Sequence, residues 1–249
     1  MDSIAAGRRF LRSHGWDAWR KEQTDQRKNL PPPPFEKPCP PGAPRVDLVT
    51  PQELGVGGLP LIEAIRRRCS RRQFSQEPLT LEEVSFLLWA TQGVRETPSD
   101  RPVALRTVPS AGGRHPFETY LVVNRVEGLE PGLYRYLPLE HQLCSLRPDA
   151  GLGARVGQAC NRQTFVGQGA VIFVWTVLPY RSEWRYGAIA HKVIAIDAGH
   201  VCQNLYLAAE AIGAGTCAIA AYNQRQMDEL LAVDGDDEFT IYVAPVGRT

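Results

Sequence analysis

The spacing of apolar residues predicts that a folded body begins near Leu59 with a helix. Leu61, Ile62 and Ile65 recur at the intervals of three and four residues that place side chains on one helical face. An arginine-rich stretch, RRRCSRRQF (66–74), follows in the last turns of this helix, where cations interact favourably with the helix dipole.

The stretch EPLTLEEVSFLLWATQG (77–93) predicts a second helix, and both of its ends are marked. Thr80 and Glu83 have the spacing of a capping box at its start, and Gly93 ends it. Its apolar face is formed by Leu81, Val84, Leu87 and Leu88.

A long helix is predicted over 187–213, with Gly199 tolerated inside it and Gly213 at its end. Its apolar positions run nearly all round, which is typical of a helix buried in a large core or in a subunit interface. Asn223 is placed to cap one more helix over QRQMDELL (224–231).

Five apolar stretches predict strands, and they mix with the helices without strict alternation. The predicted strands are FETYLVV (117–123), GLYRY (132–136), AVIFVWTVL (170–178), TCAIA (216–220) and FTIYVAPVG (239–247). This order favours an α+β layered fold over a doubly wound one, and the chain shows no internal repeat.

The chain is predicted to divide into an N-terminal part, 1–50, and a main domain, 51–249. Eight of the 20 prolines lie between Pro31 and Pro44, so this stretch is expected to be extended. We interpret 1–50 as an arm and a proline-rich strap that lies over the body of its own chain or over a partner subunit. The alternative is a free tail. The aromatic residues ahead of the prolines are Phe10, Trp16 and Trp19.

Composition and charge narrow the class of protein. With 28 basic against 27 acidic residues the formal net charge is +1, which argues against a nucleic-acid or membrane-surface binder. No apolar run approaches the roughly 18 to 20 residues of a membrane span, and no secretory signal is evident. The six cysteines form no C-x-x-C pair and a chain of 249 residues needs no disulfides, so we expect free thiols and a cytoplasmic location.

The sequence lacks the residue patterns of several kinds of catalytic site. The five histidines show no metal-ligand spacing, and the sequence holds no H-E-x-x-H, G-x-S-x-G or Walker motif. We therefore expect no metal site and neither hydrolase nor nucleoside-triphosphatase chemistry.

Arg68, Ser70 and Arg72 form a candidate anion site. If the backbone leaves the helix at this point, the three side chains can converge on one phosphate group. Guanidinium forks suit phosphate oxygens, and the serine hydroxyl adds a donor. The alternative is a solvated basic surface, against which the neighbouring Phe74 argues.

Two loops rich in small residues could let the main chain approach a flat ligand. The loop in TVPSAGGRHPFETYLVV (107–123) also offers Ser110, Arg114 and His115, although an ordinary loop is the alternative. In GAGTCAIAAY (213–222) the glycines follow a helix and precede a strand, which is the reverse of the dinucleotide-binding order. The small residues there still suit a backbone beneath a planar ring.

These segments together resemble the nitroreductase-like FMN flavoproteins. RCSRRQF resembles the R-x-S-x-R-x-F signature of that family, TVPSAGGRHPFETYLV its second flavin segment, and DAGHVCQNLYLAAEAIGAGTCAIAAY its interface helix and following strand. TDQRKNLPPPP, PLTLEEVSFLLWATQGV and GLYRYLPLEHQL resemble the SagB/ThcOx-type dehydrogenase branch. The resemblance implies an α+β fold with a central mixed or antiparallel sheet flanked by helices, and an obligate homodimer with two FMN sites at its interface.

The resemblance also implies roles for particular residues. Those expected at the FMN phosphate and ribityl chain are Arg68, Cys69, Ser70 and Arg72, with Arg248 near the phosphate. Those expected at the isoalloxazine, from the partner subunit, are Ser110, Ala111 and Gly112, with Arg114 in a similar role. The main chain of Ala220 and Ala221 is expected at the flavin edge, where the family often has glycine.

For the reaction, the resemblance implies hydride transfer between flavin N5 and a small-molecule or peptide-derived substrate. Branch members that oxidise azoline rings in peptide natural products often carry Lys-Tyr where this chain has Arg185-Tyr186. Arginine does not give up its proton, so Tyr186 is the candidate catalytic residue; the alternative is a packing tyrosine with its hydroxyl on a backbone carbonyl. Two alternative functions are an NAD(P)H-dependent nitro or quinone reductase and a flavin-fold partner of natural-product enzymes without redox turnover.

Overall fold

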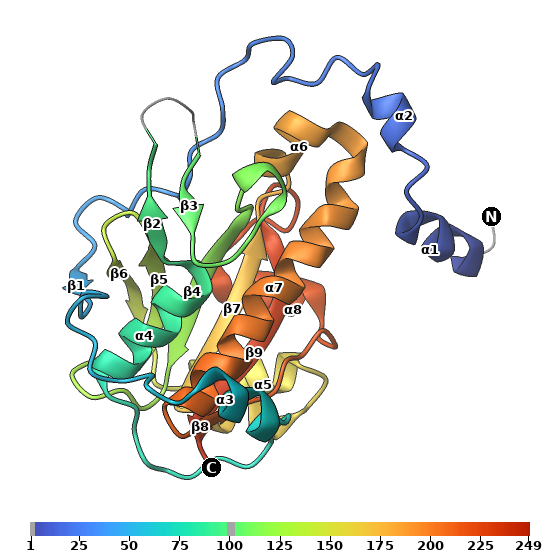
Figure 1. The fold of residues 1–249 in the computed structure, drawn as a ribbon. Coiled ribbons are helices and arrows are strands. Elements are labelled where there is room, and N and C mark those ends of the chain that lie inside the picture. The colour runs from blue at the N-terminus through green and yellow to red at the C-terminus, as the bar shows by residue number, and fades with distance from the viewer. Residues whose placement is uncertain (1–2, 99–102) are drawn as a thin grey trace.

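The computed structural model describes residues 3–98 and 103–249, and its centre is a seven-stranded sheet flanked by helices (Figure 1). The strand order is β1-β6-β5-β4-β7-β9-β8, and every pairing within this sheet is antiparallel. The sheet strands are β1 (Arg45–Asp47), β4 (Phe117–Val123), β5 (Gly132–Leu137), β6 (Gln142–Pro148), β7 (Val171–Val177), β8 (Ala214–Thr216) and β9 (Phe239–Arg248). The predicted α+β class is confirmed.

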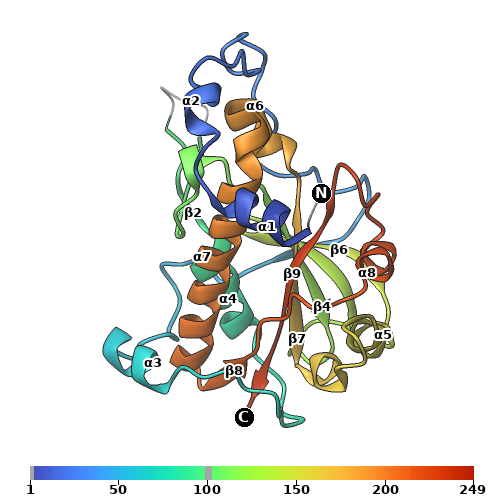
Figure 2. The same cartoon turned by 90° about the vertical axis from the view of Figure 1, so that its right-hand side faces the viewer.

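Helices cover both faces of the sheet (Figure 2). The α3, α4 and α7 helices lie on one face, while α5 and α8 lie on the other. The helices are α1 (Ser3–Leu11), α2 (Trp16–Trp19), α3 (Leu61–Arg67), α4 (Leu81–Gln92), α5 (Leu152–Ala159), α6 (Tyr180–Tyr186), α7 (Ala190–Ala211) and α8 (Gln224–Leu231). Short 3-10 turns occur at η1 (Ala111–Gly113), η2 (Thr164–Gln168) and η3 (Gly187–Ile189), and a separate hairpin joins β2 (Val94–Glu96) to β3 (Leu105–Arg106).

The alternation of side chains along β4 divides the core in two. Phe117, Leu121 and Val123 belong to the larger apolar cluster beneath α4 and α7. Tyr120 and Val122 point to the other face, into the cluster beneath α5 and α8. A strand that is covered on both faces has no side that faces solvent, and this explains the apolar residues that dominate β7 and the second half of β4.

Most predicted helix ends are confirmed by local hydrogen bonds. The Thr80 hydroxyl accepts from the Glu83 backbone at 3.2 Å and the Glu83 carboxylate accepts from the Thr80 backbone at 2.9 Å, which completes the capping box. Asn223 caps α8 by accepting from the backbone of Gln226 at 3.0 Å. The α7 helix is followed by Gly213 at a φ of +69°, a conformation that glycine adopts readily.

The strand predicted over 216–220 is wrong in its bounds. The observed β8 strand ends at Thr216, and beyond it Ile219 makes only an isolated bridge to Val243. The backbone N–H of Ala218 leaves the ladder because it donates instead to the Tyr206 hydroxyl at 2.9 Å. A side chain from a distant helix thus replaces a strand partner.

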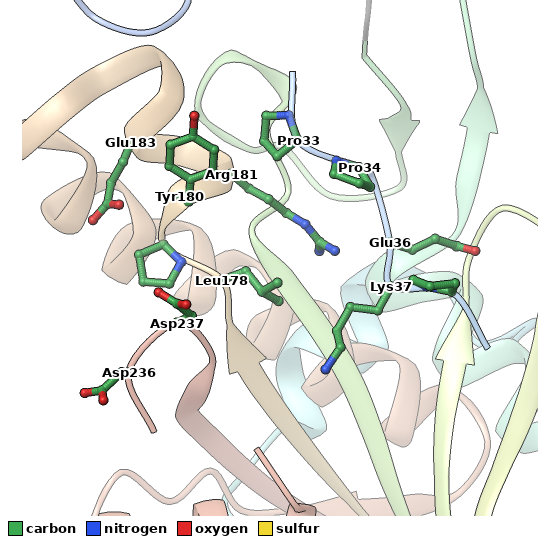
Figure 3. A pocket seen from close by; sticks show the side chains of 12 residues that line it. Pro33, Pro34, Glu36, Lys37, Leu178, Tyr180, Arg181, Glu183, Asp236 and Asp237 are labelled. Atoms are coloured by element: carbon green, nitrogen blue, oxygen red, sulfur yellow. The ribbon is translucent and has the colours of Figure 1, made fainter. Parts of the chain in front are cut away.

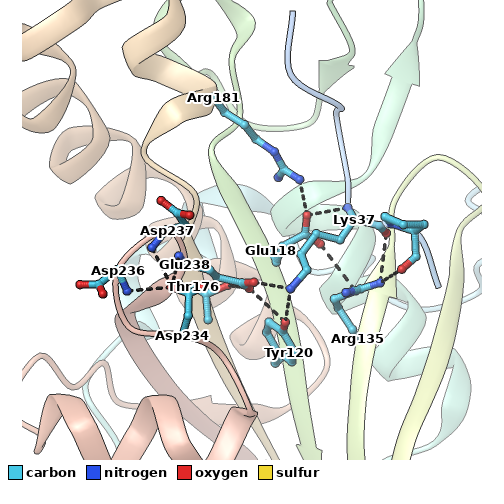
Figure 4. A network of polar contacts seen from close by, with 11 residues as sticks. Lys37, Glu118, Tyr120, Arg135, Thr176, Arg181, Asp234, Asp236, Asp237 and Glu238 are labelled. Carbon is cyan, nitrogen blue, oxygen red and sulfur yellow. Dashed lines mark hydrogen bonds and ion pairs between the residues drawn. The ribbon is translucent and has the colours of Figure 1, made fainter. Parts of the chain in front are cut away.

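The proline-rich strap lies on the body of its own chain. Arg106 donates to the Phe35 carbonyl at 2.9 Å, and Arg135 donates to the Lys37 carbonyl at 3.0 Å. Lys37 pairs with the buried Glu238, which also accepts from Tyr120 and Thr176 (Figure 4). Prolines leave few backbone donors within the strap, so buried arginines of β3 and β5 satisfy its carbonyls.

The expectation of free thiols is wrong for one pair of cysteines. Cys39 of the strap and Cys144 of β6 form a disulfide, while Cys69, Cys160 and the two remaining cysteines are free. Beside this bond β1 pairs with β6 in register, which brings the strap alongside the sheet edge. A partner 105 residues away could not be inferred from cysteine spacing. The cytoplasmic location stays a prediction.

Within the described residues, the helices are all too short or too polar to cross a membrane. The same residues contain no group of three or more histidine, cysteine, aspartate or glutamate side chains that could hold a metal ion.

Candidate functional site

Most guanidinium groups near the end of α3 are neutralised by carboxylates of the same chain. The α3 helix ends at Arg67, and the backbone then turns out of helical geometry at Arg68, whose ψ is 116°. The ion pairs are Arg66–Glu63 at 2.8 Å, Arg67–Glu63 at 3.7 Å, Arg71–Glu210 at 3.2 Å and Arg248–Glu83 at 2.5 Å.

Arg68 and Arg72 differ from these neighbours. In the described ranges 3–98 and 103–249, neither guanidinium lies within salt-bridge distance of a carboxylate. Arg68 is half-buried with its guanidinium 5.5 Å from the centre of the Tyr206 ring, and Arg72 is exposed. These two cations are therefore available to an anion that comes from outside the chain.

Tyr206 of α7 connects this cluster to the segment after β8. Its hydroxyl lies 3.0 Å from the Ser70 hydroxyl and accepts from the Ala218 backbone at 2.9 Å. The backbone of Arg71 adds a bond to the Thr216 carbonyl at 3.0 Å. Two regions that are about 145 residues apart in sequence thus form one surface, on which Ser70 remains exposed.

The loop with Ser110 and Ala111 is held at the other end of α7. Asp197 accepts from the Ser110 hydroxyl at 2.6 Å and from the Ala111 backbone at 3.0 Å. Burial raises the pKa of Asp197, which is 4% exposed. Gly112 has a φ of +59°, so the tight turn at this position favours glycine.

Arg114 and His115 are directed into the protein rather than to the loop surface. Arg114 is 3% exposed, donates to the Arg181 carbonyl at 3.0 Å and lies 4.8 Å from the Trp184 ring centre. Burial lowers the pKa of Arg114 and brings that of His115 down to about 3, so the imidazole is neutral at physiological pH.

Tyr186 lies directly against this loop. A Cβ atom placed on Gly112 would be 2.6 Å from the Tyr186 hydroxyl and 2.8 Å from the Arg185 guanidinium Nε. Tyr186 is 8% exposed, and among the described residues its hydroxyl makes no hydrogen bond. The alternative interpretation, in which a backbone carbonyl holds this hydroxyl, has no support in the described contacts.

One chain does not bring all predicted residues together. The loop of Ser110 contacts α7 at Asp197, whereas Ser70 contacts it at Tyr206. Nine residues of helix separate these two points, which is about 14 Å at 1.5 Å per residue. Ala220 and Ala221 lie exposed beyond the Tyr206 contact.

A cavity of ≈450 Å³ lies elsewhere, between the strap and α6 (Figure 3). Prolines of the strap and Tyr180 line it, and Asp236, Asp237 and Glu183 lie on one side of it. Arg181 also reaches this cavity, with its guanidinium paired to buried Glu118 (Figure 4). None of the residues that we predicted to bind a flavin lines this cavity, and no motif in the sequence indicated it.

Sequence reasoning missed the polar residues that organise the two ends of α7. Asp197, Tyr206 and Glu210 each hold a segment of the candidate site. The sequence could have indicated them, because they are polar residues in a helix that is otherwise apolar nearly all round. Buried polar groups need hydrogen-bond partners.

The comparisons with known proteins agree with this architecture. The chain matches the model of the Nitroreductase family over residues 65–248. It is 32% identical over 196 residues to "Putative nitroreductase MJ1384" of Methanocaldococcus jannaschii, which covers 76% of this chain and 94% of that protein. The crystal structure of a "putative nitroreductase" from Ralstonia eutropha has a TM-score of 0.67 at 27% identity, and covers 88% of this chain and 99% of that chain.

A shorter match points to a more specialised relative. The trifolitoxin-processing protein TfxB of Rhizobium leguminosarum bv. trifolii is 30% identical over 112 residues, which cover 43% of this chain and 30% of that protein. The family model, in contrast, spans well over half of the chain. The protein therefore belongs to the Nitroreductase family.

Proposed function

We propose that the protein is an FMN-dependent oxidoreductase of the SagB/ThcOx dehydrogenase type. It would transfer a hydride between flavin N5 and a small-molecule or peptide-derived substrate. The observation that carries this proposal is that Arg68 and Arg72 lack carboxylate partners, within the described chain, in a cluster where the neighbouring arginines are ion-paired.

The residues at this end fit an FMN phosphate. A phosphate monoester carries nearly two negative charges, which two guanidinium groups can neutralise with bidentate hydrogen bonds. Ser70 and Cys69 lie between them in the chain and are exposed. Arg248 is ion-paired with Glu83 and donates to the Ile212 carbonyl. We therefore propose that it holds the segments around the phosphate site together.

The other end fits a planar ring. Ser110, Ala111 and Gly112 offer a small-residue main chain, and Asp197 fixes its course. When bound, FMN supplies a ring that accepts or gives a hydride at N5. The exposed main chain of Ala220 and Ala221 is proposed to contact the edge of that ring.

Tyr186 is proposed to move a proton to or from the substrate. Its hydroxyl points at Gly112 and lacks an internal hydrogen bond in the described parts of the chain, so a substrate atom can become its partner. Arg185 lies beside it with the guanidinium 5.5 Å from the ring centre, and there it provides a fixed positive charge rather than a base.

A homodimer would complete the site. The contacts of Ser110 and Ser70 with α7 lie about 14 Å apart along one helix. We therefore propose that each FMN takes its phosphate contacts from one subunit and the Ser110 loop from the other. Apolar side chains on α3 support such an interface, since Leu61, Ile62 and Ile65 are 63%, 57% and 58% exposed.

The match to TfxB supports a peptide-derived substrate and partner enzymes of natural-product biosynthesis. The family match supports a second candidate, an NAD(P)H-dependent nitro or quinone reductase. A third candidate, a flavin-fold assembly partner without redox turnover, differs from both because it predicts no reducible flavin.

The absorbance spectrum of the purified protein separates these candidates. An oxidoreductase should show a bound flavin that dithionite bleaches, and a reductase should be bleached by NADH or NADPH in a stopped-flow experiment as well. A colourless protein that does not take up added FMN would contradict both enzymatic candidates and favour the assembly partner.

A further inference from the structure

The N-terminal arm, which we define as residues 3–30, crosses the candidate active site at Tyr186. The ring centres of Trp16 and Trp19 lie 6.2 and 5.8 Å from that of Tyr186. The two indoles also contact each other edge to face, with centres 5.3 Å apart. Three aromatic rings from two distant parts of the chain thus form one cluster.

The arm is held in this position by polar contacts to the same helix. The indole N–H of Trp19 donates to the Arg185 carbonyl at 3.1 Å. Seven residues further on, the Gln26 backbone donates to the Trp184 carbonyl at 2.9 Å, and the Trp184 indole donates to the Leu30 carbonyl at 3.1 Å. The guanidinium of Arg27 lies 4.5 Å from the Trp19 ring centre and covers its outer side.

The position of the Tyr186 hydroxyl depends on this aromatic packing. Within the described residues the hydroxyl has no hydrogen bond of its own, so ring contacts set where it lies relative to Gly112. Trp16 and Trp19 are only half-buried, and each keeps part of an indole surface free. Aromatic pairs of this kind contribute about 0.5 to 1.5 kcal/mol beyond their buried area.

We propose that Trp16 and Trp19 are positioning residues for Tyr186, whose ring contacts hold the tyrosine hydroxyl beside Gly112. This inference rests on the proposed oxidoreductase function and adds to it the part of the chain that sets the place of the proposed proton-transfer group. The arm, which lies outside the segment that matches the family model, then contributes to the reaction.

The first experiment measures how fast menadione reoxidises the dithionite-reduced, FMN-loaded protein in a stopped-flow instrument. The quinone takes up a hydride and one proton and becomes the hydroquinone, and Tyr186 is placed to supply that proton. We expect Trp19→Ala and Tyr186→Phe each to slow this step about tenfold. The double variant should be no more than about twofold slower than either, because both changes remove the same function.

Two further variants make this result specific. Trp19→Phe keeps an aromatic ring and should recover most of the lost rate. Leu11→Ala removes an exposed apolar side chain of the same arm, 66% exposed, and should react as the wild type does. A wild-type rate for Trp19→Ala, or losses that multiply in the double variant, would overturn the proposal.

The second experiment uses the apoprotein, so it reports on the arm without any flavin. Trypsin cleavage after the exposed residues Arg20 and Lys21 is followed by mass spectrometry. Tyr186→Ala should speed this cleavage severalfold because the arm loses its aromatic contact, whereas an unchanged rate would show that the packing does not hold the arm. If no variant binds FMN, the proposed function fails and the proteolysis result still decides whether Tyr186 fastens the arm.

Discussion

At the scale of single residues, we expect FMN binding to weaken when an arginine without a carboxylate partner in the described chain is removed. Replacing Arg72 by Ala should weaken FMN binding by roughly 1.5 to 3 kcal/mol, the scale of a hydrogen bond to a charged group. This corresponds to about a ten- to 150-fold increase in Kd, which can be measured by fluorescence titration of apoprotein with FMN. Arg66→Ala is the matched control, because Arg66 is an exposed arginine of the same stretch that is already paired with Glu63. Equal FMN binding by both variants would count against the phosphate site.

Asp197 carries a second prediction at this scale. Asn in its place keeps one acceptor oxygen but loses the charge that Ser110 and the Ala111 backbone bond to. We expect Asp197→Asn to lower the free energy of unfolding by about 1 to 3 kcal/mol, the cost of leaving buried polar groups poorly satisfied. Urea unfolding of the apoprotein measures this directly. An unchanged unfolding curve would mean that the loop does not depend on this carboxylate.

The spacing of Arg68, Ser70 and Arg72 singled these residues out as one candidate anion site, and that assignment stays a prediction. Spacing could not show that Arg71 and Arg248 are neutralised. Their partners, Glu210 and Glu83, are more than 130 residues away in each case, and only the fold brings them near. Local patterns reveal which side chains share a stretch of chain, whereas charge pairing depends on tertiary contacts.

At the scale of elements, the strap predicts a pH dependence of stability. Burial raises the pKa of Glu36 to about 7, with Glu140 and Glu118 adding repulsion, although the Leu139 backbone donates to it at 3.0 Å. An unfolded Glu titrates near pH 4.3, so between about pH 4.3 and pH 7 the folded state holds more protons. Stability should therefore fall as the pH rises through this range.

The variant Glu36→Gln isolates this effect, because glutamine cannot titrate. Urea unfolding at pH 5 and at pH 8 should show a larger loss of stability for the wild type than for the variant. If both proteins lose the same amount between the two pH values, Glu36 does not hold its proton in the folded strap.

Elements with clear local signals were predicted well, and those that depend on distant contacts were not. The capping box of α4 and the mostly apolar β7 need only their own residues to be recognised. The β8 strand was misplaced because Tyr206 captures the Ala218 backbone. The path of the strap depends on Arg106 of β3 and Arg135 of β5, which are far from it in sequence.

At the scale of the whole molecule, the exposed apolar face of α3 predicts a dimer. Leu61 lines a cavity of ≈370 Å³ together with residues of α4 and α7. Leu61→Lys should cost little in a monomer, because the side chain is 63% exposed there, but it would bury a charge in a dimer interface. We expect light scattering to show a shift from dimer to monomer, together with loss of bound FMN.

Leu139→Lys is the control for this prediction, since Leu139 is 43% exposed in the connection between β5 and β6. It should leave the mass in solution unchanged. A wild-type protein that sediments as a monomer at micromolar concentration would contradict the dimer and the shared FMN site with it.

The disulfide of the strap affects how Trp16 and Trp19 keep their place beside Tyr186. The bond between Cys39 and Cys144 links the chain to the sheet edge. The two tryptophans, which precede it, can therefore move away from Tyr186 but remain close to it. A tethered group meets its own site at an effective concentration on the order of millimolar. The tryptophans therefore return to Tyr186 after each departure, and the position of its hydroxyl is restored without the help of a second molecule.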